Sequence, residues 1–311
     1  MEAAHHPLII TSYLGRNPRA VPWLIDLATS LAIPVYLSCP TNMSFPMTHP
    51  LFVGLSYGMD ENKWLREADV ILVIDSDIPW ITTHNKPRPD ARIFHIDVDV
   101  LKQNMGMFHL DAEIRAQADG ELALRAILQE VSKLQAENDM RVLRHNSVVS
   151  AHNEWVATLT DAEDPSKSSI ITVPHVISML RTTAPLKTLF LNESVSNFVP
   201  VWSHLLPTRP GSTFSSGASS LGWGLGAAIG ASIGGTASPE TSDNEFIALV
   251  VGDGSFLFGV PSSAYWIARR YETVSLLGKG FCYDSQLISN YPAIPDCGFE
   301  QWRLEGRSPA P

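Results

Sequence analysis

Short apolar runs rich in branched side chains alternate with stretches of helical spacing between residues 7 and 131. The apolar runs predict strands at residues 8–15, 33–38, 68–75 and 91–99. The stretches of helical spacing predict helices at residues 20–32 and 61–68. Because the predicted strands are apolar on both faces, they favour a parallel sheet that helices cover on both sides. This part of the chain is therefore expected to form a doubly wound α/β domain.

The same alternation returns after residue 169. Helices are predicted at residues 171–181, 225–233 and 261–273, and strands at residues 188–194 and 246–249. Residues 132–169 are polar, helix-prone at first and turn-like later, which predicts a connector. We therefore expect an α/β protein with two doubly wound parallel-sheet, Rossmann-like domains, at residues 1–135 and 169–273, joined by a connector at residues 136–168.

Residues 274–311 do not continue this alternation. The segment is rich in Pro, Gly and Ser and lacks the strand and helix periodicity needed to complete a sheet. We expect it to be divergent and poorly ordered, and the second domain to be incomplete at its C-terminus.

Composition and charge narrow the classes of function. The hydrophobic content of 45% is that of a folded globular protein. A formal net charge of −10, without any Lys/Arg-rich run, argues against nucleic acid as a partner. No apolar stretch reaches the roughly 18 to 20 residues of a membrane span, and the N-terminus does not read as a signal peptide. Three scattered cysteines, Cys39, Cys282 and Cys297, favour reduced thiols. We expect a cytoplasmic location, with an organellar one left open.

Four carboxylates follow predicted strands of the first domain. Parallel sheets bind ligands at the carboxyl ends of their strands, and these positions carry Asp75, Asp77, Asp97 and Asp99. They could hold a metal ion or a ribose, but Asp after a strand more often caps a helix or closes a turn, and we favour that interpretation. The segment after the first strand, SYLGRNPRA, supplies one glycine and no dinucleotide fingerprint. The first domain is interpreted as a scaffold.

The most biased stretch of the chain is PGSTFSSGASSLGWGLGAAIGASIGG, residues 210–235, with eight Gly and seven Ser or Thr. Gly222, Gly224 and Ala227 match a GxGxxA dinucleotide fingerprint, but a long Ser/Gly loop stands where a strand should precede it. A second interpretation is a close-packed helix of small residues. A third is a helix whose N-terminal loop cradles a diphosphate with its N–H groups and positive end. The later stretch VVGDGSFLFG, residues 250–259, is either an ordinary turn or a site for the carboxylate of Asp253.

These motifs together resemble a known family. The order LNES, GASSLGWGLGAAIG, ALVVGDGSF and the helix PSSAYWIARRYET resembles the diphosphate-binding domain of thiamine diphosphate enzymes. Within that family it looks most like the benzoylformate decarboxylase and acetolactate synthase branch. The stretches ADVILVID and FHIDVD resemble the central domain of the same enzymes. The resemblance covers roughly residues 7 to 273, and it implies thiamine diphosphate and Mg²⁺ as cofactors.

The resemblance also implies roles for individual residues. Asp253 would be a ligand of Mg²⁺, and Leu221 would be the apolar wedge that bends the cofactor. The other residues implied at the cofactor are Glu193, Ser194, Ser196, Gly217, Ala218, Ser219, Ser220, Gly252, Gly254 and Ser255.

The sequence departs from the family pattern in two places. The family supplies an Asn-Asn pair to the metal somewhat under 30 residues after GDG, but Lys279 to Cys282 contain no Asn, and neither Asp284 nor Asn290 has the right spacing. The family also begins with a pyrimidine-binding domain whose glutamate protonates the cofactor, whereas this chain starts almost at the central domain. No glutamate of this chain, Glu193 included, is assigned that role.

The leading functional hypothesis is a thiamine-diphosphate-dependent 2-oxo-acid decarboxylase or acetolactate-synthase-like protein, in which a cofactor ylid attacks a 2-oxo acid. The chain is expected to be a fragment that needs a partner for activity, either as a homodimer or paired with a full-length relative. The alternative is a non-catalytic, degenerate paralogue that acts as a binding module. An NAD-dependent enzyme is the weakest hypothesis.

Overall fold

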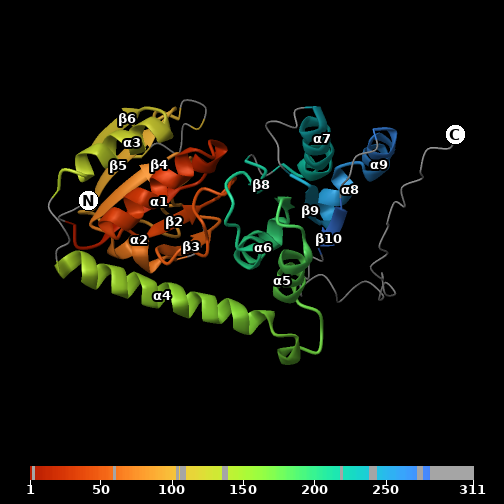
Figure 1. The fold of residues 1–311 in the computed structure, drawn as a ribbon, viewed down its shortest axis with the longest axis horizontal. Helices are drawn as coiled ribbons and strands as arrows, with labels where there is room; N and C mark the ends of the chain where they lie inside the picture. The colour runs from red at the N-terminus through yellow and green to blue at the C-terminus, as the bar shows by residue number, and fades with distance from the viewer. Residues whose placement is uncertain are drawn as a thin grey trace.

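The structure is a computed structural model of the 311-residue chain. It describes residues 1, 4–58, 61–102, 105, 110–134, 139–217, 220–237, 244–271 and 276–280. Two parallel sheets, each with helices against it, lie side by side, and one long helix runs along the first domain and ends near a helix of the second (Figure 1). The expected architecture of two doubly wound α/β domains is confirmed.

The first sheet has the strand order β3-β2-β1-β4-β5-β6, and every neighbouring pair is parallel. Its strands are β1 (Pro7–Thr11), β2 (Val35–Ser38), β3 (Phe52–Ser56), β4 (Val70–Ile74), β5 (Arg92–Asp97) and β6 (Ile114–Gln117). The described residues of this domain also form the 3₁₀ turn η1 (Leu14–Arg16) and the helices α1 (Ala20–Leu31), α2 (Lys63–Glu67) and α3 (Gly120–Val131).

Successive residues of the central strands enter different hydrophobic cores. Ile9 packs into the core that includes residues of α1 and α3, whereas Leu8 and Ile10 pack into the core that includes Leu65 of α2. Side chains of a strand alternate between its two faces. The continuous apolar runs of the sequence therefore mark strands that are buried on both faces.

Two strands of this sheet were not predicted from the sequence. β3 and β6 are the two edge strands. β3 contains Gly54, and the segment IRAQ of β6 is largely exposed. Neither has the apolar pattern of a central strand, because an edge strand is paired on one side only and needs less apolar burial.

The predicted connector contains the longest helix, α4 (Asp139–Glu163), followed by the 3₁₀ turn η2 (Pro165–Lys167). Val148, His152 and Leu159 are buried along α4. Arg144 donates hydrogen bonds to the carbonyl oxygens of Ala4, Leu31 and Ala32, near the end of α1. The connector is therefore docked on the first domain over part of its length.

The second sheet has the order β10-β9-β7-β8, again parallel throughout. Its strands are β7 (Thr188–Glu193), β8 (Thr213–Ser215), β9 (Phe246–Gly252) and β10 (Leu276–Gly280). Its helices are α5 (Val173–Thr183), η3 (Val195–Asn197), α6 (Phe198–Leu205), α7 (Trp223–Ala237), α8 (Asp253–Phe258) and α9 (Pro261–Arg270). Residues of α7 and α9 join one hydrophobic core of this domain, and residues of α5 and α6 join another.

The expectation that the tail from residue 274 onward is poorly ordered is corrected at its start, where strand β10 lies. It lies within residues 274–311, where no regular element was predicted, and it pairs in parallel with β9 from Leu276 opposite Ala248 to Gly280 opposite Gly252. Its sequence LLGKG carries two glycines and is short, so its strand character depends on pairing with β9 more than on local pattern. Residues 281–311 lie outside the described residues.

The two domains share a hydrophobic core. Phe198 and Trp202 of α6 belong to the same buried cluster as residues of β1, β2, β4, α1 and α3. Asn42 of the first domain also forms an antiparallel bridge with Phe214 of β8. Among the helices in the described part of the chain, none has the length and hydropathy that a membrane crossing requires.

Candidate functional site

The predicted site residues lie around the carboxyl ends of β7, β8 and β9. Glu193 ends β7, Ser215 ends β8 and Gly252 ends β9. A narrow cleft of about 20 Å³ is lined by Glu193, Ser194 and Ser220, together with Tyr57, Asn192, Val195, Phe198, Ser215 and Ser216. The structure thus brings together residues that the sequence separates into the LNES stretch and the Ser/Gly loop. Because the domains meet here, Tyr57 of the first domain also contributes to the cleft.

The other predicted residues that the structure describes do not line this cleft. Ser196 lies on η3 and is exposed, as are Gly217 and Leu221. Asp253 and Gly254 are exposed at the start of α8, whereas Gly252 and Ser255 are buried beside them. Ala218 and Ser219 lie outside the described residues. The assignment of all of these residues to a cofactor stays a prediction.

Glu193 is buried and holds the start of α7. Its carboxylate accepts backbone N–H bonds from Gly222 at 2.5 Å, Trp223 at 3.0 Å and Gly224 at 2.7 Å. These groups belong to the first turn of the helix, where N–H groups have no partner within the helix. These three N–H groups are therefore bonded to a carboxylate of the chain itself, and the interpretation of this loop and helix end as a diphosphate cradle stays a prediction.

Glycine is required at two positions of this turn. Gly222 has a φ of +92°, and a Cβ there would lie 3.1 Å from the Cα and N atoms of Gly259, just after α8. A Cβ on Gly224 would lie 2.7 Å from Oε2 of Glu193. Glycine adopts a positive φ more readily than other residues, and it alone lacks the Cβ that these close approaches exclude. The GWG sequence thus lets the turn contact Glu193 on one side and the end of α8 on the other.

Asn192 is a site residue that the sequence reasoning did not single out. It is 1% exposed, and its Oδ1 accepts hydrogen bonds from the backbone N–H and the hydroxyl of Ser194. These bonds fix the orientation of the amide, and among the described residues its Nδ2 has no partner. An orphaned buried donor is costly. The sequence signal that could have identified Asn192 is its position as a polar residue in the buried run TLFLNES.

Asp253 begins α8 directly after the buried strand β9. Its Oδ1 accepts the N–H of Gly254 at 2.8 Å, and its side chain remains exposed. The described residues contain no group of three or more His, Cys, Asp or Glu that could hold a metal. Mg²⁺ usually takes one or two protein carboxylates and completes its coordination with phosphate oxygens and water, so the donor set at Asp253 suits a metal that arrives with a diphosphate.

Two of the four carboxylates predicted at the strand ends of the first domain, Asp77 and Asp97, pair with an internal cation. Nζ of the buried Lys102 lies 2.8 Å from Oδ1 of Asp77 and 2.7 Å from Oδ2 of Asp97. The hydroxyl of Tyr13 donates to Asp97 at 2.6 Å. Asp97 and Asp99 also accept backbone N–H groups, from Asp99 and Lys102 respectively. The turn-closing role favoured from the sequence is thus seen at these two residues, and Lys102 is the partner that sequence reasoning missed.

These contacts shift the pKa values of the cluster. Burial acts to raise the pKa of Asp97, but His95 at 3.9 Å, the Asp99 N–H, Lys102 and Tyr13 outweigh it and hold that pKa well below its ordinary range. Burial and the neighbouring Asp97 carboxylate raise the pKa of the Tyr13 hydroxyl. The cluster is therefore a closed ion-pair network rather than an open ligand site.

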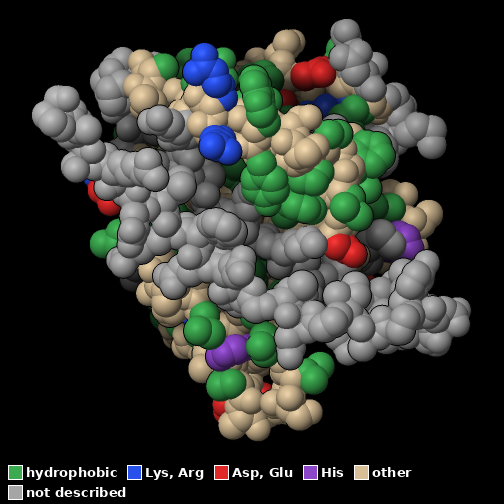
Figure 2. Space-filling model, turned by 90° about the vertical axis from the view of Figure 1, so that its right-hand side faces the viewer, with side chains coloured by type: hydrophobic (Ala, Val, Ile, Leu, Met, Phe, Trp, Pro, Cys, Tyr) green, Lys and Arg blue, Asp and Glu red, His purple; other side chains and the backbone are tan. Residues whose placement is uncertain are grey.

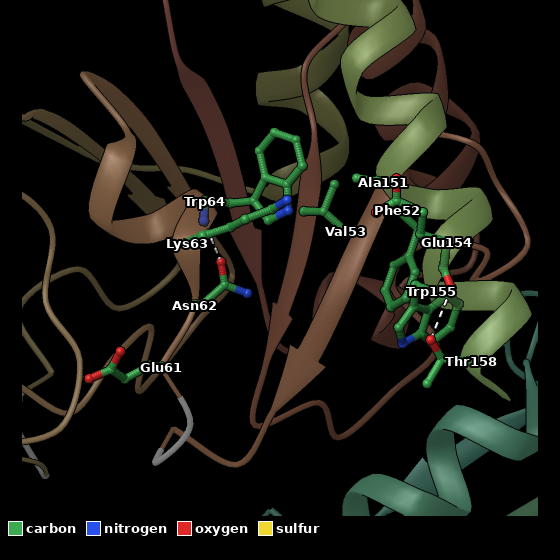
Figure 3. Close-up of a pocket in the computed structure, with 10 residues that line it drawn as sticks. All are labelled: Phe52, Val53, Glu61, Asn62, Lys63, Trp64, Ala151, Glu154, Trp155 and Thr158. Carbon is green, nitrogen blue, oxygen red and sulfur yellow. Dashed lines mark hydrogen bonds between the residues drawn. The ribbon is translucent and has the colours of Figure 1, made fainter. Parts of the chain in front are cut away.

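A larger pocket lies away from the strand ends. It has a volume of about 310 Å³ and lies between edge strand β3, α2 and α4, with Phe52, Trp64 and Trp155 on its walls (Figure 3). None of the predicted site residues lines it. The smaller cleft, which Glu193, Ser194 and Ser220 line, is therefore the candidate functional site.

The surface beside the cleft carries exposed hydrophobic side chains. Figure 2 shows the side of the molecule with α8 and α9, where hydrophobic side chains gather. Those on α8, α9 and the loop between them are Leu257, Phe258, Val260, Tyr265 and Trp266. We call these five residues the α8–α9 face. Exposed apolar groups gathered in this way commonly mark an interaction surface.

Two protein-family models match the chain. Residues 1–127 match the thiamine pyrophosphate enzyme central domain, and residues 195–276 match the thiamine pyrophosphate enzyme C-terminal TPP-binding domain. The second match includes Leu221, Asp253 and most of the other predicted site residues, while Glu193 and Ser194 precede it.

Solved structures of similar fold agree with the family models. A benzoylformate decarboxylase from Polynucleobacter necessarius is 18% identical, with a TM-score of 0.68 over 96% of this chain and 54% of that one. A putative thiamin diphosphate-dependent enzyme from Mycobacterium smegmatis is 21% identical, with a TM-score of 0.65 over 89% of this chain and 50% of that one. A thiamine diphosphate-dependent 4-hydroxybenzoylformate decarboxylase from Rhodococcus jostii RHA1 is 23% identical, with a TM-score of 0.62 over 89% and 49%. At these identities the likeness shows the fold, and this chain spans about half the length of each.

Proposed function

Since this chain belongs to the thiamine pyrophosphate enzyme family, we propose that thiamine diphosphate binds at the ends of β7, β8 and β9, over the residues that surround the narrow cleft. The observation that carries the proposal is the orphaned Nδ2 donor of Asn192 in a serine-lined cleft, since a buried donor needs a partner and a polar group of a bound cofactor would supply one. The cofactor, when bound, supplies a carbon nucleophile that adds to a 2-oxo acid and takes up the electrons left when CO₂ departs.

The residues of the chain bind and orient the cofactor in this proposal. Asp253 holds Mg²⁺ against the diphosphate, with Gly252, Gly254 and Ser255 beside it. A Cβ built on Gly254 meets no atom within 4 Å, so its backbone is open to a ligand. Leu221 would contact the middle of the cofactor. Ser194, Ser196, Gly217, Ala218, Ser219 and Ser220 would contact its ring or diphosphate.

We further propose a 2-oxo-acid decarboxylase or acetolactate-synthase-like activity for the assembled enzyme. The solved structures similar to this chain include a benzoylformate decarboxylase and a 4-hydroxybenzoylformate decarboxylase, which supports a 2-oxo acid as substrate. The α8–α9 face adjoins the residue proposed to bind metal, Asp253. A pyrimidine-binding domain supplied by a longer relative would cover this face and supply the carboxylate that protonates the cofactor.

The proposal is tested by calorimetric titration of the purified chain with thiamine diphosphate and Mg²⁺. Binding should be saturable, should require Mg²⁺ and should be lost in Asp253→Ala, because that change removes the carboxylate ligand. Asp26→Ala, at an exposed position of α1, is the matched control and should bind like the wild type. Wild-type binding weaker than about 1 mM, a free energy of roughly 4 kcal/mol, would contradict the proposal and favour a non-catalytic module.

A further inference from the structure

Glu193 has both carboxylate oxygens occupied by the protein itself. Oε1 accepts the N–H groups of Gly222 and Trp223, and Oε2 accepts that of Gly224. The side chain is 5% exposed. Carboxylates are favourable at a helix N-terminus because the N–H groups and the helix dipole are both positive there. These bonds leave the residue little capacity to contact a cofactor as well.

The three N–H groups link separate parts of the site. Glu193 ends β7, and the turn that it holds comes directly after Ser220 and Leu221. The same turn packs on the end of α8, because Gly222 lies against Gly259 and a Cβ on Gly259 would lie 2.8 Å from Leu225. Asp253 is the first residue of α8. The position of the carboxylate thus determines where the Ser/Gly loop lies relative to the proposed metal ligand.

We propose that Glu193 is a positioning residue that anchors the Gly222–Gly224 turn and thereby sets the spacing between Leu221 and α8 for the cofactor. The anchoring is a property of the chain alone, whereas the effect on the cofactor rests on the proposed function. Glu193 acts through backbone N–H groups and is no proton donor in this proposal.

The first experiment measures hydrogen exchange at Gly222, Trp223 and Gly224 without any cofactor. In Glu193→Ala these amides should exchange about tenfold faster or more, because each loses a hydrogen bond to a charged acceptor. Glu193→Gln keeps the shape but replaces one acceptor oxygen with an NH₂ group, so at least one of the three amides should lose protection. Glu245→Ala, at an exposed carboxylate of the same domain 3.8 Å from Lys187, should leave all three unchanged.

Chemical rescue distinguishes anchoring from a general loss of packing. Acetate matches the CH₂–COO⁻ portion that Glu193→Ala removes. Millimolar acetate should therefore restore amide protection saturably in Glu193→Ala and have no effect on the wild type or on Glu245→Ala. Unchanged exchange in Glu193→Ala, or acceleration that acetate does not reverse, would overturn the anchoring role.

The second experiment titrates the same proteins with thiamine diphosphate and Mg²⁺. The Kd should rise about tenfold or more in Glu193→Ala and fall again with acetate. Unchanged affinity with lost amide protection would overturn the positioning of the cofactor. If the wild type binds no cofactor while acetate rescue succeeds, the proposed function fails and the anchoring of the turn stands.

Discussion

Asp75 is a buried carboxylate whose protonation links the stability of the first domain to pH. It has a φ of +46°, and Nη2 of Arg16 donates to its Oδ1 at 3.3 Å. Burial raises its pKa to about 6, with Arg16 acting in the opposite direction and Asp97 adding to the rise. Because the folded-state pKa lies above the ordinary value of 3.8, the folded protein binds this proton more tightly than the unfolded chain. The resulting stabilisation is complete below pH 3.8 and is lost as the pH rises through 6.

Asp75→Asn should therefore remove a pH-dependent term from the free energy of unfolding. Asn tolerates a positive φ and stays neutral. The stability of the wild type relative to the variant should fall by roughly 2–3 kcal/mol between pH 4 and pH 7. Urea denaturation of both proteins at several pH values measures this difference. A difference that does not vary with pH would show that the buried carboxyl group does not titrate in this window.

At the residue scale, sequence motifs placed the candidate residues at strand ends but did not give the partners of their side chains. The LNES and GDG stretches both fall at strand ends of one sheet, as expected. The bonds from Gly222 and Gly224 to Glu193 join residues 29 and 31 positions apart, and nothing local in the sequence specifies them. Lys102 and Asn192 were missed for the same reason, because their significance depends on which groups the fold brings near them.

At the element scale, one arginine of α4 bonds to three backbone carbonyl oxygens of the first domain. Arg144 donates to the carbonyl oxygens of Ala4 and Ala32 at 2.9 and 2.8 Å, and to that of Leu31. The last carbonyl groups of a helix have no partner within it, and α1 ends at Leu31, so this guanidinium satisfies the end of α1. The docking of α4 thus depends on polar contacts as well as on its few buried side chains.

Arg144→Met should lower the free energy of unfolding by about 2–4 kcal/mol, since it keeps the apolar stem but leaves buried carbonyl groups without donors. Arg66→Met, at an exposed arginine 3.1 Å from Glu61, should cost less than about 1 kcal/mol. Chemical denaturation of the two variants beside the wild type compares them. Equal decreases in the free energy of unfolding would show that the three carbonyl contacts of Arg144 stabilise the fold no more than a surface ion pair does.

The elements that sequence predicted and those that it missed differ in what stabilises them. The central strands β1, β2, β4, β5, β7 and β9 were predicted, because apolar residues dominate their sequences and each strand is paired on both sides. Strands β3, β6 and β10 depend on pairing with a neighbour, and their sequences carry glycines or exposed polar residues. Helix α6 was also missed, since Pro200 interrupts its pattern, although proline is tolerated in the first turn of a helix.

At the scale of the whole molecule, the two domains are expected to unfold together. Trp202 is fully buried in the core cluster that contains residues of the first domain, and its Nε1 donates to Oγ of Ser215 at 3.0 Å. Phe198 of the same helix packs against Tyr57 of the first domain with ring centroids 4.7 Å apart. Since one core includes side chains of both domains, neither can lose its packing without exposing apolar surface of the other.

Calorimetry of the wild type should therefore show one cooperative transition, and Trp202→Ala should show two. The substitution removes a fully buried indole from the shared core and leaves a cavity, so it should also destabilise by about 3–5 kcal/mol. Trp266→Ala, at a tryptophan of α9 that is 66% exposed, should keep the single transition because it lies outside the shared core. Two transitions in the wild type, or one in Trp202→Ala, would mean that the shared core does not couple the domains. Coupling of this kind bears on function, because the candidate cleft includes Tyr57 from one domain and Asn192 from the other and needs both in place.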